Sequence, residues 1–102
     1  MDIAEIQRYV QADRFTFTDH AIRRMLERNI NDLEVKQAIL SGEVIEEYPD
    51  DKYSPSCLIY GQTASGRALH VQCSLPPLVK IVTTYEPDPA EWLDNRIRRK
   101  KS

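Results

Sequence analysis

The sequence has 102 residues, a length that predicts a single domain spanning residues 1–102. Hydrophobic residues (41%) and charged residues (29%) are balanced as in soluble proteins, and no run approaches the roughly 18 apolar residues of a membrane span. The N-terminus lacks signal-peptide character, so we expect a cytoplasmic protein with no membrane contact. The net charge of −2 excludes a polycation but not a local basic site, since residues 96–101 read Arg-Ile-Arg-Arg-Lys-Lys.

The first part of the chain has the apolar spacing of helices. A short amphipathic helix is predicted over residues 2–12, and residues 15–17 form a brief extended segment. Thr18 is a suitable N-cap for a second helix, because its hydroxyl can accept a hydrogen bond from a free amide of the first turn. This second helix runs to about Asn29.

A third helix is predicted directly after a very short turn. Asn31 and Glu34 have the spacing of a capping box, in which two free amides at a helix start are satisfied reciprocally. Gly42 follows the last apolar position and is expected to end this helix in the left-handed conformation. The side chains of the second and third helices that we expect to face inward are Ala21, Ile22, Met25, Leu26, Val35, Ala38 and Ile39.

From residue 43 the apolar period changes to that of strands. Strands are predicted at residues 44–48, 57–62, 67–74 and 78–85, separated by a loop at 49–56, a hairpin turn at 63–66 and a connection at 75–77. The prolines Pro87 and Pro89 end the sheet, because neither can serve a central ladder. Asp88 is placed to cap a short C-terminal helix that carries Trp92, and residues 96–102 are expected to be a frayed basic tail.

Helices followed by consecutive short strands predict an α+β fold, with the N-terminal helices packed on a three- to four-stranded antiparallel sheet. Alternation places Leu69, Val71 and Cys73 on one face of the third strand, and Ala68, His70 and Gln72 on the other. In the fourth strand, alternation places Val79, Ile81, Thr83 and Tyr85 on one face and Lys80, Val82 and Thr84 on the other. The residues predicted in or near the core are Ile22, Met25, Leu26, Val35, Ile39, Leu69, Val71, Ile81 and Val82.

One face of the second helix is polar. His20, Arg24, Glu27 and Arg28 are spaced by three or four residues and therefore share that face. A histidine backed by guanidinium groups suits a phosphate and its proton transfers. The alternative is a solvated face of surface ion pairs, in which the position of His20 has no function.

The strands carry a second group of candidates. Arg67 follows the predicted hairpin turn, His70 points to the polar face of the sheet, and Tyr85 stands near the end of the fourth strand. Lys80 lies at the start of that strand. The alternatives are a half-buried strand histidine with a satisfied hydrogen bond, and a rim tyrosine that packs beside Pro87 and Trp92.

Two cysteines lie on neighbouring predicted strands. Cys57 and Cys73 are directly opposed if the hairpin loop has three residues, and fall on opposite faces if it has two or four. We expect reduced, largely buried thiols without a metal, because their neighbours are apolar and no CxxC spacing is present. A Cys2His2 zinc site would need both cysteines and both histidines to converge.

The candidate residue types suit one reaction well. Metal-free RNA cleavage attacks the phosphate with the ribose 2′-hydroxyl, and it needs a base for that hydroxyl, cations for the phosphorane and an acid for the 5′-oxygen. Histidine, arginine, lysine and tyrosine supply these functions.

The motifs in combination resemble those of a family of small bacterial and archaeal domains of unknown function. They are Phe17-Thr18-Asp19-His20-Ala21, Arg24-Met25, Arg28, Gly42-Glu43-Val44-Ile45-Glu46, Gly66-Arg67-Ala68-Leu69-His70-Val71 and Thr84-Tyr85-Glu86-Pro87. The resemblance spans roughly residues 14–95. That family is placed near the RelE-like and BrnT-like toxins, in the barnase/RelE nuclease fold, so the resemblance implies helices packed on a small antiparallel sheet.

The resemblance further implies a toxin-like ribonuclease, or mRNA interferase, of a type II toxin–antitoxin system. It implies metal-independent cleavage without a cofactor, an RNA substrate, and a cognate antitoxin protein with a zinc-finger-type domain as partner. The residues carried over as catalytic are His20, Arg24, Arg67, His70 and Tyr85, and those carried over as RNA-binding are Arg28 and Lys80. RelE itself has a lysine- and arginine-rich surface, whereas this chain is net acidic, so ribosome dependence is not implied.

Two other classes of function remain open at this point. The first is a non-catalytic module of the same fold that binds a protein or RNA. The second is a metal-binding or small-molecule protein.

Overall fold

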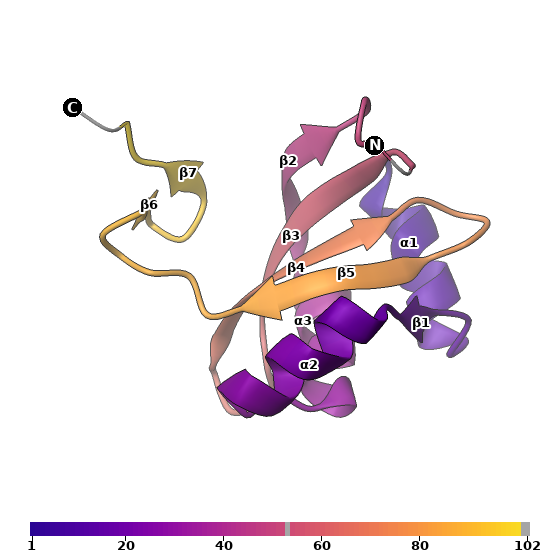
Figure 1. Ribbon diagram of the computed structural model, residues 1–102, viewed down its shortest axis with the longest axis horizontal. Helices are drawn as coiled ribbons and strands as arrows, with labels where there is room; N and C mark the ends of the chain where they lie inside the picture. The colour runs from indigo at the N-terminus through magenta and orange to yellow at the C-terminus, as the bar shows by residue number, and fades with distance from the viewer. Residues whose placement is uncertain (53, 101–102) are drawn as a thin grey trace.

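The computed structural model describes residues 1–52 and 54–100. Within them the chain forms helices α1 (Ile3–Gln11), α2 (Asp19–Arg28) and α3 (Asp32–Ser41), and strands β1 (Thr16–Phe17), β2 (Glu43–Tyr48), β3 (Ser56–Gln62), β4 (Ala68–Ser74), β5 (Lys80–Tyr85), β6 (Trp92–Leu93) and β7 (Ile97–Arg98) (Figure 1). The described strands make one five-stranded sheet, in the order β1-β5-β4-β3-β2, and a separate two-stranded sheet of β6 and β7. The predicted α+β class is therefore confirmed.

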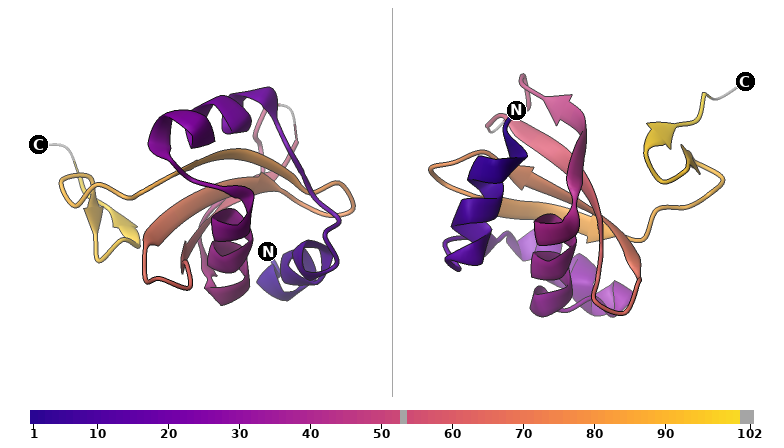
Figure 2. Two further views of the ribbon diagram at one scale, coloured as in Figure 1. Left: turned by 90° about the horizontal axis from the view of Figure 1, so that it is seen from below. Right: turned by 180° about the vertical axis from the view of Figure 1, so that it is seen from behind.

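Local capping signals set the helix boundaries as predicted. The Thr18 hydroxyl accepts a hydrogen bond from the Ala21 amide (3.0 Å), and Asn31 and Glu34 form the complete capping box. Asn29 ends α2 in the left-handed conformation (φ 53°). Helices α1 and α3 lie on one side of the main sheet, and α2 runs along β5 (Figure 2).

The end of α3 differs from the prediction. Gly42 is extended (φ −97°), so the expected left-handed cap is wrong. A Cβ on Gly42 would lie 2.5 Å from the Ala38 carbonyl oxygen, and one on Gly61 would lie only 1.8 Å from the same atom. Both glycines are needed because the backbone of α3 approaches β3 more closely than any side chain allows.

The sheet is mixed, so the prediction of an antiparallel sheet of three to four strands is wrong in this respect. Strand β1 pairs in parallel with β5 at the sheet edge, and the other pairs of the main sheet are antiparallel. The Thr16 amide donates to the Val79 carbonyl (3.0 Å) and the Thr18 amide to the Ile81 carbonyl (3.0 Å). A two-residue strand is too short to show an apolar period, and its pairing depends on where the entry to α2 is held.

Register on the two central strands follows from the β3–β4 hairpin. The Thr63 amide donates to the Arg67 carbonyl (2.9 Å), which leaves a three-residue loop that includes Gly66 in the left-handed region (φ 88°). Cys57 is therefore directly opposed to Cys73, the first of the two arrangements that the sequence left open. Both are buried free thiols, as predicted.

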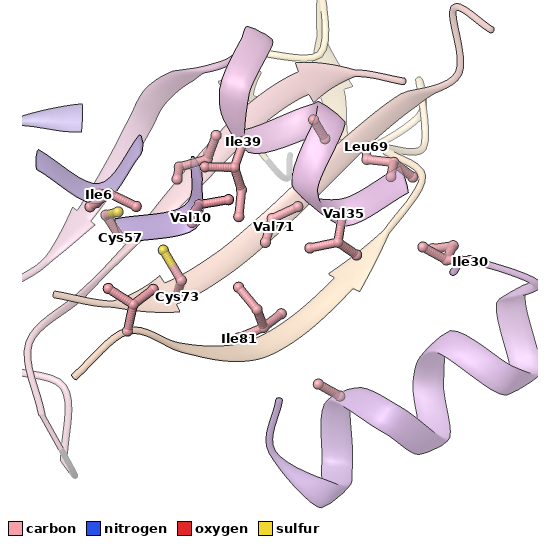
Figure 3. Close-up of a cluster of buried hydrophobic side chains, with 14 of the residues drawn as sticks. Ile6, Val10, Ile30, Val35, Ile39, Cys57, Leu69, Val71, Cys73 and Ile81 are labelled. Carbon is pink, nitrogen blue, oxygen red and sulfur yellow. The ribbon is translucent and has the colours of Figure 1, made fainter. Parts of the chain in front are cut away.

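The core lies between the main sheet and the helices (Figure 3). The predicted core residues Met25, Val35, Ile39, Leu69, Val71 and Ile81 are buried. Ile22 and Leu26 were predicted wrongly, because 46% and 79% of their surfaces are exposed. Helix α2 turns only Ala21 and Met25 inward, since it packs along the edge strands rather than across the sheet. Val82 is half-buried.

The C-terminal segment forms a hairpin in place of the predicted short helix. Asp94 and Asn95 are both left-handed (φ 51° and 59°), and the Arg96 amide donates to the Leu93 carbonyl (3.0 Å). The positive φ angles of Asp94 and Asn95 are those of a type I′ turn, and Leu93 opposes Ile97, so a loop of three residues joins the two strands. Asp88 caps a single turn, in which its side chain accepts a bond from the Ala90 amide (2.9 Å).

Part of the segment 96–102, expected to be a frayed tail, takes part in this hairpin. Residues Ile97–Arg98 form β7, whereas the last two residues of the segment lie outside the described part of the chain. Among the described helices, none has both the length and the apolar character needed to cross a bilayer.

Candidate functional site

The outer face of the main sheet, opposite α1 and α3, carries a cluster of aromatic rings around His70. The His70 ring meets Tyr60, Tyr85 and Trp92 edge-on, with centroid distances of 6.0, 5.3 and 4.5 Å. His70 itself has no exposed surface, Tyr60 and Trp92 are buried, and Tyr85 is half-buried. Tyr85 is therefore the member of this aromatic cluster that connects the buried His70 ring to the solvent-exposed surface.

Hydrogen bonds fix the protonation state of His70. Its Nε2 lies 2.6 Å from the Asn95 carbonyl oxygen, and its Nδ1 lies 3.3 Å from the Tyr85 hydroxyl. A carbonyl oxygen can only accept, so Nε2 carries the proton. Burial lowers the pKa of His70 below its ordinary value, which keeps the ring neutral near pH 7, and Nδ1 then accepts the Tyr85 O–H. Burial raises the pKa of Tyr85, so this hydroxyl keeps its proton.

A β-bulge brings Tyr85 to His70. The register shifts between β4 and β5, so that Gln72 opposes Thr83 while Cys73 opposes Ile81, and the extra residue is Val82. Strict alternation had placed Tyr85 on the same face as Ile81, and this prediction is wrong. The bulge moves Tyr85 to the outer face, directly opposite His70.

Three arginines surround the aromatic cluster, and we call Arg28, Arg96 and Arg98 the arginine rim. Arg28 lies with its guanidinium carbon 5.9 Å from the centre of the Tyr85 ring and donates to the Thr84 carbonyl (2.8 Å). Arg96 stacks on Tyr60 at 4.8 Å, and Arg98 stacks on Trp92 at 4.5 Å. Each of these side chains thus covers an aromatic ring and presents positive charge to solvent.

Acidic side chains of β2 hold two members of the rim. Arg98 donates to both carboxylate oxygens of Glu46, with distances of 3.0 and 3.3 Å, and Arg96 forms an ion pair with Glu43. Burial opposes ionisation of Glu46, but hydrogen bonds from Arg98 and Tyr48 outweigh it and lower the pKa of the carboxyl group. Glu46 is therefore charged at neutral pH.

The structure brings three of the predicted site residues together: His70, Tyr85 and Arg28. Arg67 has a different role. It donates to the carbonyls of Arg28 (2.9 Å) and Asn29 (2.7 Å) and forms ion pairs with Glu34 (3.2 Å) and Glu86 (3.1 Å). This arginine ties the end of α2 to α3 and to the residue after β5, and most of its donors are already used.

The other predicted residues lie away from the aromatic cluster. His20 is exposed in the first turn of α2, and eight residues of helix separate it from Arg28 by about 12 Å along the axis. Arg24 pairs on the surface with Glu27 (2.8 Å). Lys80 is exposed and lines a groove of about 710 Å³ with Pro76 and Pro77.

Six residues of the cluster and its surroundings were not predicted, and Trp92 was expected only as a packing neighbour of Tyr85. The six are Glu43, Glu46, Tyr60, Asn95, Arg96 and Arg98. The available signals were the single tryptophan, the adjacent Asp94 and Asn95, and the charge complementarity between β2 and the basic run. Within the described ranges, no group of three or more His, Cys, Asp or Glu side chains is arranged to hold a metal ion.

Comparison with known proteins gives one family. A family model described as "Domain of unknown function (DUF4258)" matches residues 17–86, which is more than half of the chain. No curated protein and no solved structure matches the sequence significantly. The match covers Phe17 of β1, helices α2 and α3 and strands β2 to β5, including His70 and Tyr85, and ends before the C-terminal hairpin. The chain belongs to the DUF4258 family.

Proposed function

We propose that this protein is a toxin-like, metal-independent endoribonuclease, an mRNA interferase of a type II toxin–antitoxin system, and that it acts at His70, Tyr85 and Arg28. The observation that carries the proposal is the contact between the Tyr85 hydroxyl and Nδ1 of a neutral His70, with a guanidinium beside the tyrosine ring. The resemblance to RelE-like and BrnT-like toxins supports the same reaction class.

In the proposed reaction, Tyr85 contacts the RNA and His70 acts behind it. The Tyr85 oxygen takes the proton of the ribose 2′-hydroxyl while the Tyr85 proton passes to Nδ1 of His70. The 2′-oxygen attacks the phosphorus, the bond to the 5′-oxygen breaks, and that oxygen takes a proton from water. The hydroxide left from this water takes a proton from the Tyr85 hydroxyl while Nδ1 of His70 returns its proton to the Tyr85 oxygen, which restores both residues. The products are a 2′,3′-cyclic phosphate and a 5′-hydroxyl.

Two charges suit this proton transfer. Burial and the positive charge of Arg98 lower the pKa of His70 and disfavour the imidazolium, while the Asn95 carbonyl and the negative charge of Glu46 partly offset this cost. Arg28 lies where a guanidinium can neutralise the phosphorane, because it is exposed and adjacent to the tyrosine ring. The raised pKa keeps the Tyr85 hydroxyl protonated, so Tyr85 can accept the 2′-hydroxyl proton only while it passes its own proton to His70.

The remaining predicted residues extend the proposal along the RNA. His20 lies in the exposed first turn of α2, where free amides and the helix dipole favour a phosphate. Arg24 lies about one turn further along the helix, and Lys80 adds a positive charge at the far end of β5. The partners in this proposal are an RNA substrate and a cognate antitoxin with a zinc-finger-type domain, on the strength of the resemblance alone.

A second candidate function is a non-catalytic module that binds RNA or protein. The complete burial of His70 favours it, because no substrate atom can reach the ring directly in this conformation. The two candidates differ in one respect: only the ribonuclease requires the Tyr85 hydroxyl for bond cleavage.

The test compares Tyr85→Phe with Tyr9→Phe. Each change removes one hydroxyl from a tyrosine that lies beside an arginine, but Tyr9 packs on α1 against Arg14. We expect Tyr85→Phe to lower the cleavage rate of a single-stranded RNA by about 10²–10⁴-fold, the usual effect of losing a general base, without loss of RNA binding. Tyr9→Phe should cleave as the wild type does. Equal cleavage by both variants would remove Tyr85 from the chemistry, and a wild type that binds RNA without cleaving it supports the binding module.

A further inference from the structure

The C-terminal hairpin, residues 92–98, is attached to the main sheet by side chains and one carbonyl. In the described chain its strands pair only with each other. It meets the main sheet through the ion pairs of Arg96 with Glu43 and Arg98 with Glu46, the Asn95 carbonyl on His70, and the packing of Trp92. Figures 1 and 2 show it beside the sheet, joined to β5 by an extended connection.

The two arginines of this hairpin do not use all of their N–H groups in contacts with the glutamates and the Asp94 carbonyl. A guanidinium has five N–H groups. Arg98 uses Nε and Nη2 on Glu46, and Arg96 uses Nε on Glu43 and Nη1 on the Asp94 carbonyl. Arg98 also interacts with the Tyr48 hydroxyl. The guanidinium groups remain accessible, because 50% of the Arg96 side chain and 59% of that of Arg98 is exposed.

Both guanidinium planes are already oriented. Each is stacked on a buried aromatic ring, Arg96 on Tyr60 and Arg98 on Trp92, and each is held by a glutamate. A guanidinium that is fixed in this way loses little conformational freedom when it binds a ligand. Its outer face is available to stack an unpaired base, and its unused N–H groups can hold a phosphate.

We propose that Arg96 and Arg98 form a binding site for the backbone of single-stranded RNA, with Glu43 and Glu46 as the groups that orient them. The phosphates take the unused N–H groups, and bases stack on the outer faces of the two guanidinium planes. This inference rests on the proposed function, since it names where the RNA substrate lies next to Tyr85. It excludes duplex RNA, whose bases are not available for stacking.

Binding is measured with a short fluorescein-labelled single-stranded RNA in which every 2′-hydroxyl is methylated, so that it cannot be cleaved by the 2′-oxygen. The test variant carries Arg96→Gln and Arg98→Gln, and the matched control carries Arg8→Gln and Arg23→Gln, which remove two exposed arginines from α1 and α2. Both variants have the same net charge.

We expect the test variant to bind at least about tenfold more weakly than the control, and the slope of log K against log salt to fall by about 1.4, or 0.7 for each lost phosphate contact on a single strand. A variant with lysine at both positions keeps the charge but loses the planar stack, and should bind with intermediate affinity. Equal binding by the test and control variants overturns the inference, as does equal affinity of the wild type for duplex RNA.

The glutamates provide a second, opposite expectation. Glu43→Gln removes a negative charge beside Arg96, whereas Glu47→Gln removes one that pairs with the N-terminal amino group; both glutamates are 51% exposed. The glutamine oxygen can still accept the Arg96 Nε–H and orient the guanidinium, while the charge that repels phosphate is lost. We therefore expect tighter RNA binding for Glu43→Gln than for Glu47→Gln, and the reverse order overturns the inference. If polyglutamate of equal charge displaces the RNA as well as unlabelled RNA does, the site recognises charge alone and an acidic protein becomes the better ligand.

Failure of this inference is separable from failure of the proposed function. Cleavage that persists while the arginine variants bind normally refutes only the binding site. Binding that depends on Arg96 and Arg98 in a protein that cleaves no RNA refutes only the ribonuclease.

Discussion

Replacing Arg67 separates a structural arginine from a catalytic one. The proposed change is Arg67→Met, which keeps the length of the aliphatic chain and removes the five donors. In the structure these donors hold the Arg28 and Asn29 carbonyls, which end α2, together with Glu34 and Glu86. The loss should therefore appear in the free energy of unfolding.

The magnitude follows from the exposure of each partner. A hydrogen bond to a charged group contributes about 1.5–3 kcal/mol when buried. Arg67 is 21% exposed, so we take about 1 kcal/mol for each of the two carbonyls and for Glu34, which is 20% exposed. Glu86 is 59% exposed and adds about 0–1 kcal/mol. The expected loss is about 3–4 kcal/mol, or a fall in Tm of at least about 12 °C for a domain of this size.

Urea denaturation followed by circular dichroism measures this loss. Arg24→Met is the matched control, because Arg24 was predicted with the same function but contacts only Glu27 on the surface. The control should lie within about 0.5 kcal/mol of the wild type. An Arg67→Met protein that loses less than about 0.5 kcal/mol would refute the structural role and return Arg67 to the list of candidate phosphate ligands.

Two further predictions concern backbone approach and pH. Gly61→Ala should lower the free energy of unfolding by about 3 kcal/mol or more, because its Cβ would lie 1.8 Å from the Ala38 carbonyl oxygen. Gly66→Ala has open space around it and should lower it by about 1–2 kcal/mol, because of its φ of 88°. Urea titrations that reverse this order contradict the account. Burial depresses the pKa of His70 in the folded state, so the unfolded chain binds more protons below about pH 6.5. The free energy of unfolding should therefore fall from pH 7 to pH 5, by up to about 1.4 kcal/mol per pH unit. His70→Asn should lose this part of the slope, and a slope unchanged by that substitution would show that His70 does not titrate as described.

Local signals predicted the helical part of the fold well. The N-cap at Thr18 and the capping box of Asn31 and Glu34 depend on residues three positions apart, so the sequence contains all the information needed. The exposure of Ile22 and Leu26 could not be predicted in this way. An apolar stripe shows which side of a helix is hydrophobic, but how much of it is covered depends on whether the helix crosses a sheet or follows its edge.

The C-terminal hairpin was missed for a different reason. Asp94 and Asn95 tolerate the left-handed conformation and therefore suit a tight turn, but strands of two residues have no measurable period. The extended segment at residues 15–17 was predicted, but its parallel pairing with β5 was not, because that partner is distant in the sequence.

The candidate site was predicted in its residue types and only partly in its geometry. His70, Tyr85 and Arg28 were chosen because they are titratable or cationic in patterned elements. Their meeting depends on a bulge at Val82, which no alternation pattern reveals. The group that sets the His70 tautomer is the backbone carbonyl of Asn95, which has no signature in the side-chain sequence.

The most direct test of the central claim uses an RNA substrate with a single 2′-deoxynucleotide at a mapped cleavage position. The account predicts that the wild-type protein cleaves the all-ribose RNA in the presence of a metal chelator and leaves a 2′,3′-cyclic phosphate. It also predicts that the deoxy substitution abolishes cleavage at that position alone, because the attacking oxygen is absent, while binding is unchanged. Cleavage at the deoxy position, or cleavage that stops when the chelator is added, would contradict a reaction in which Tyr85 and His70 activate the 2′-hydroxyl.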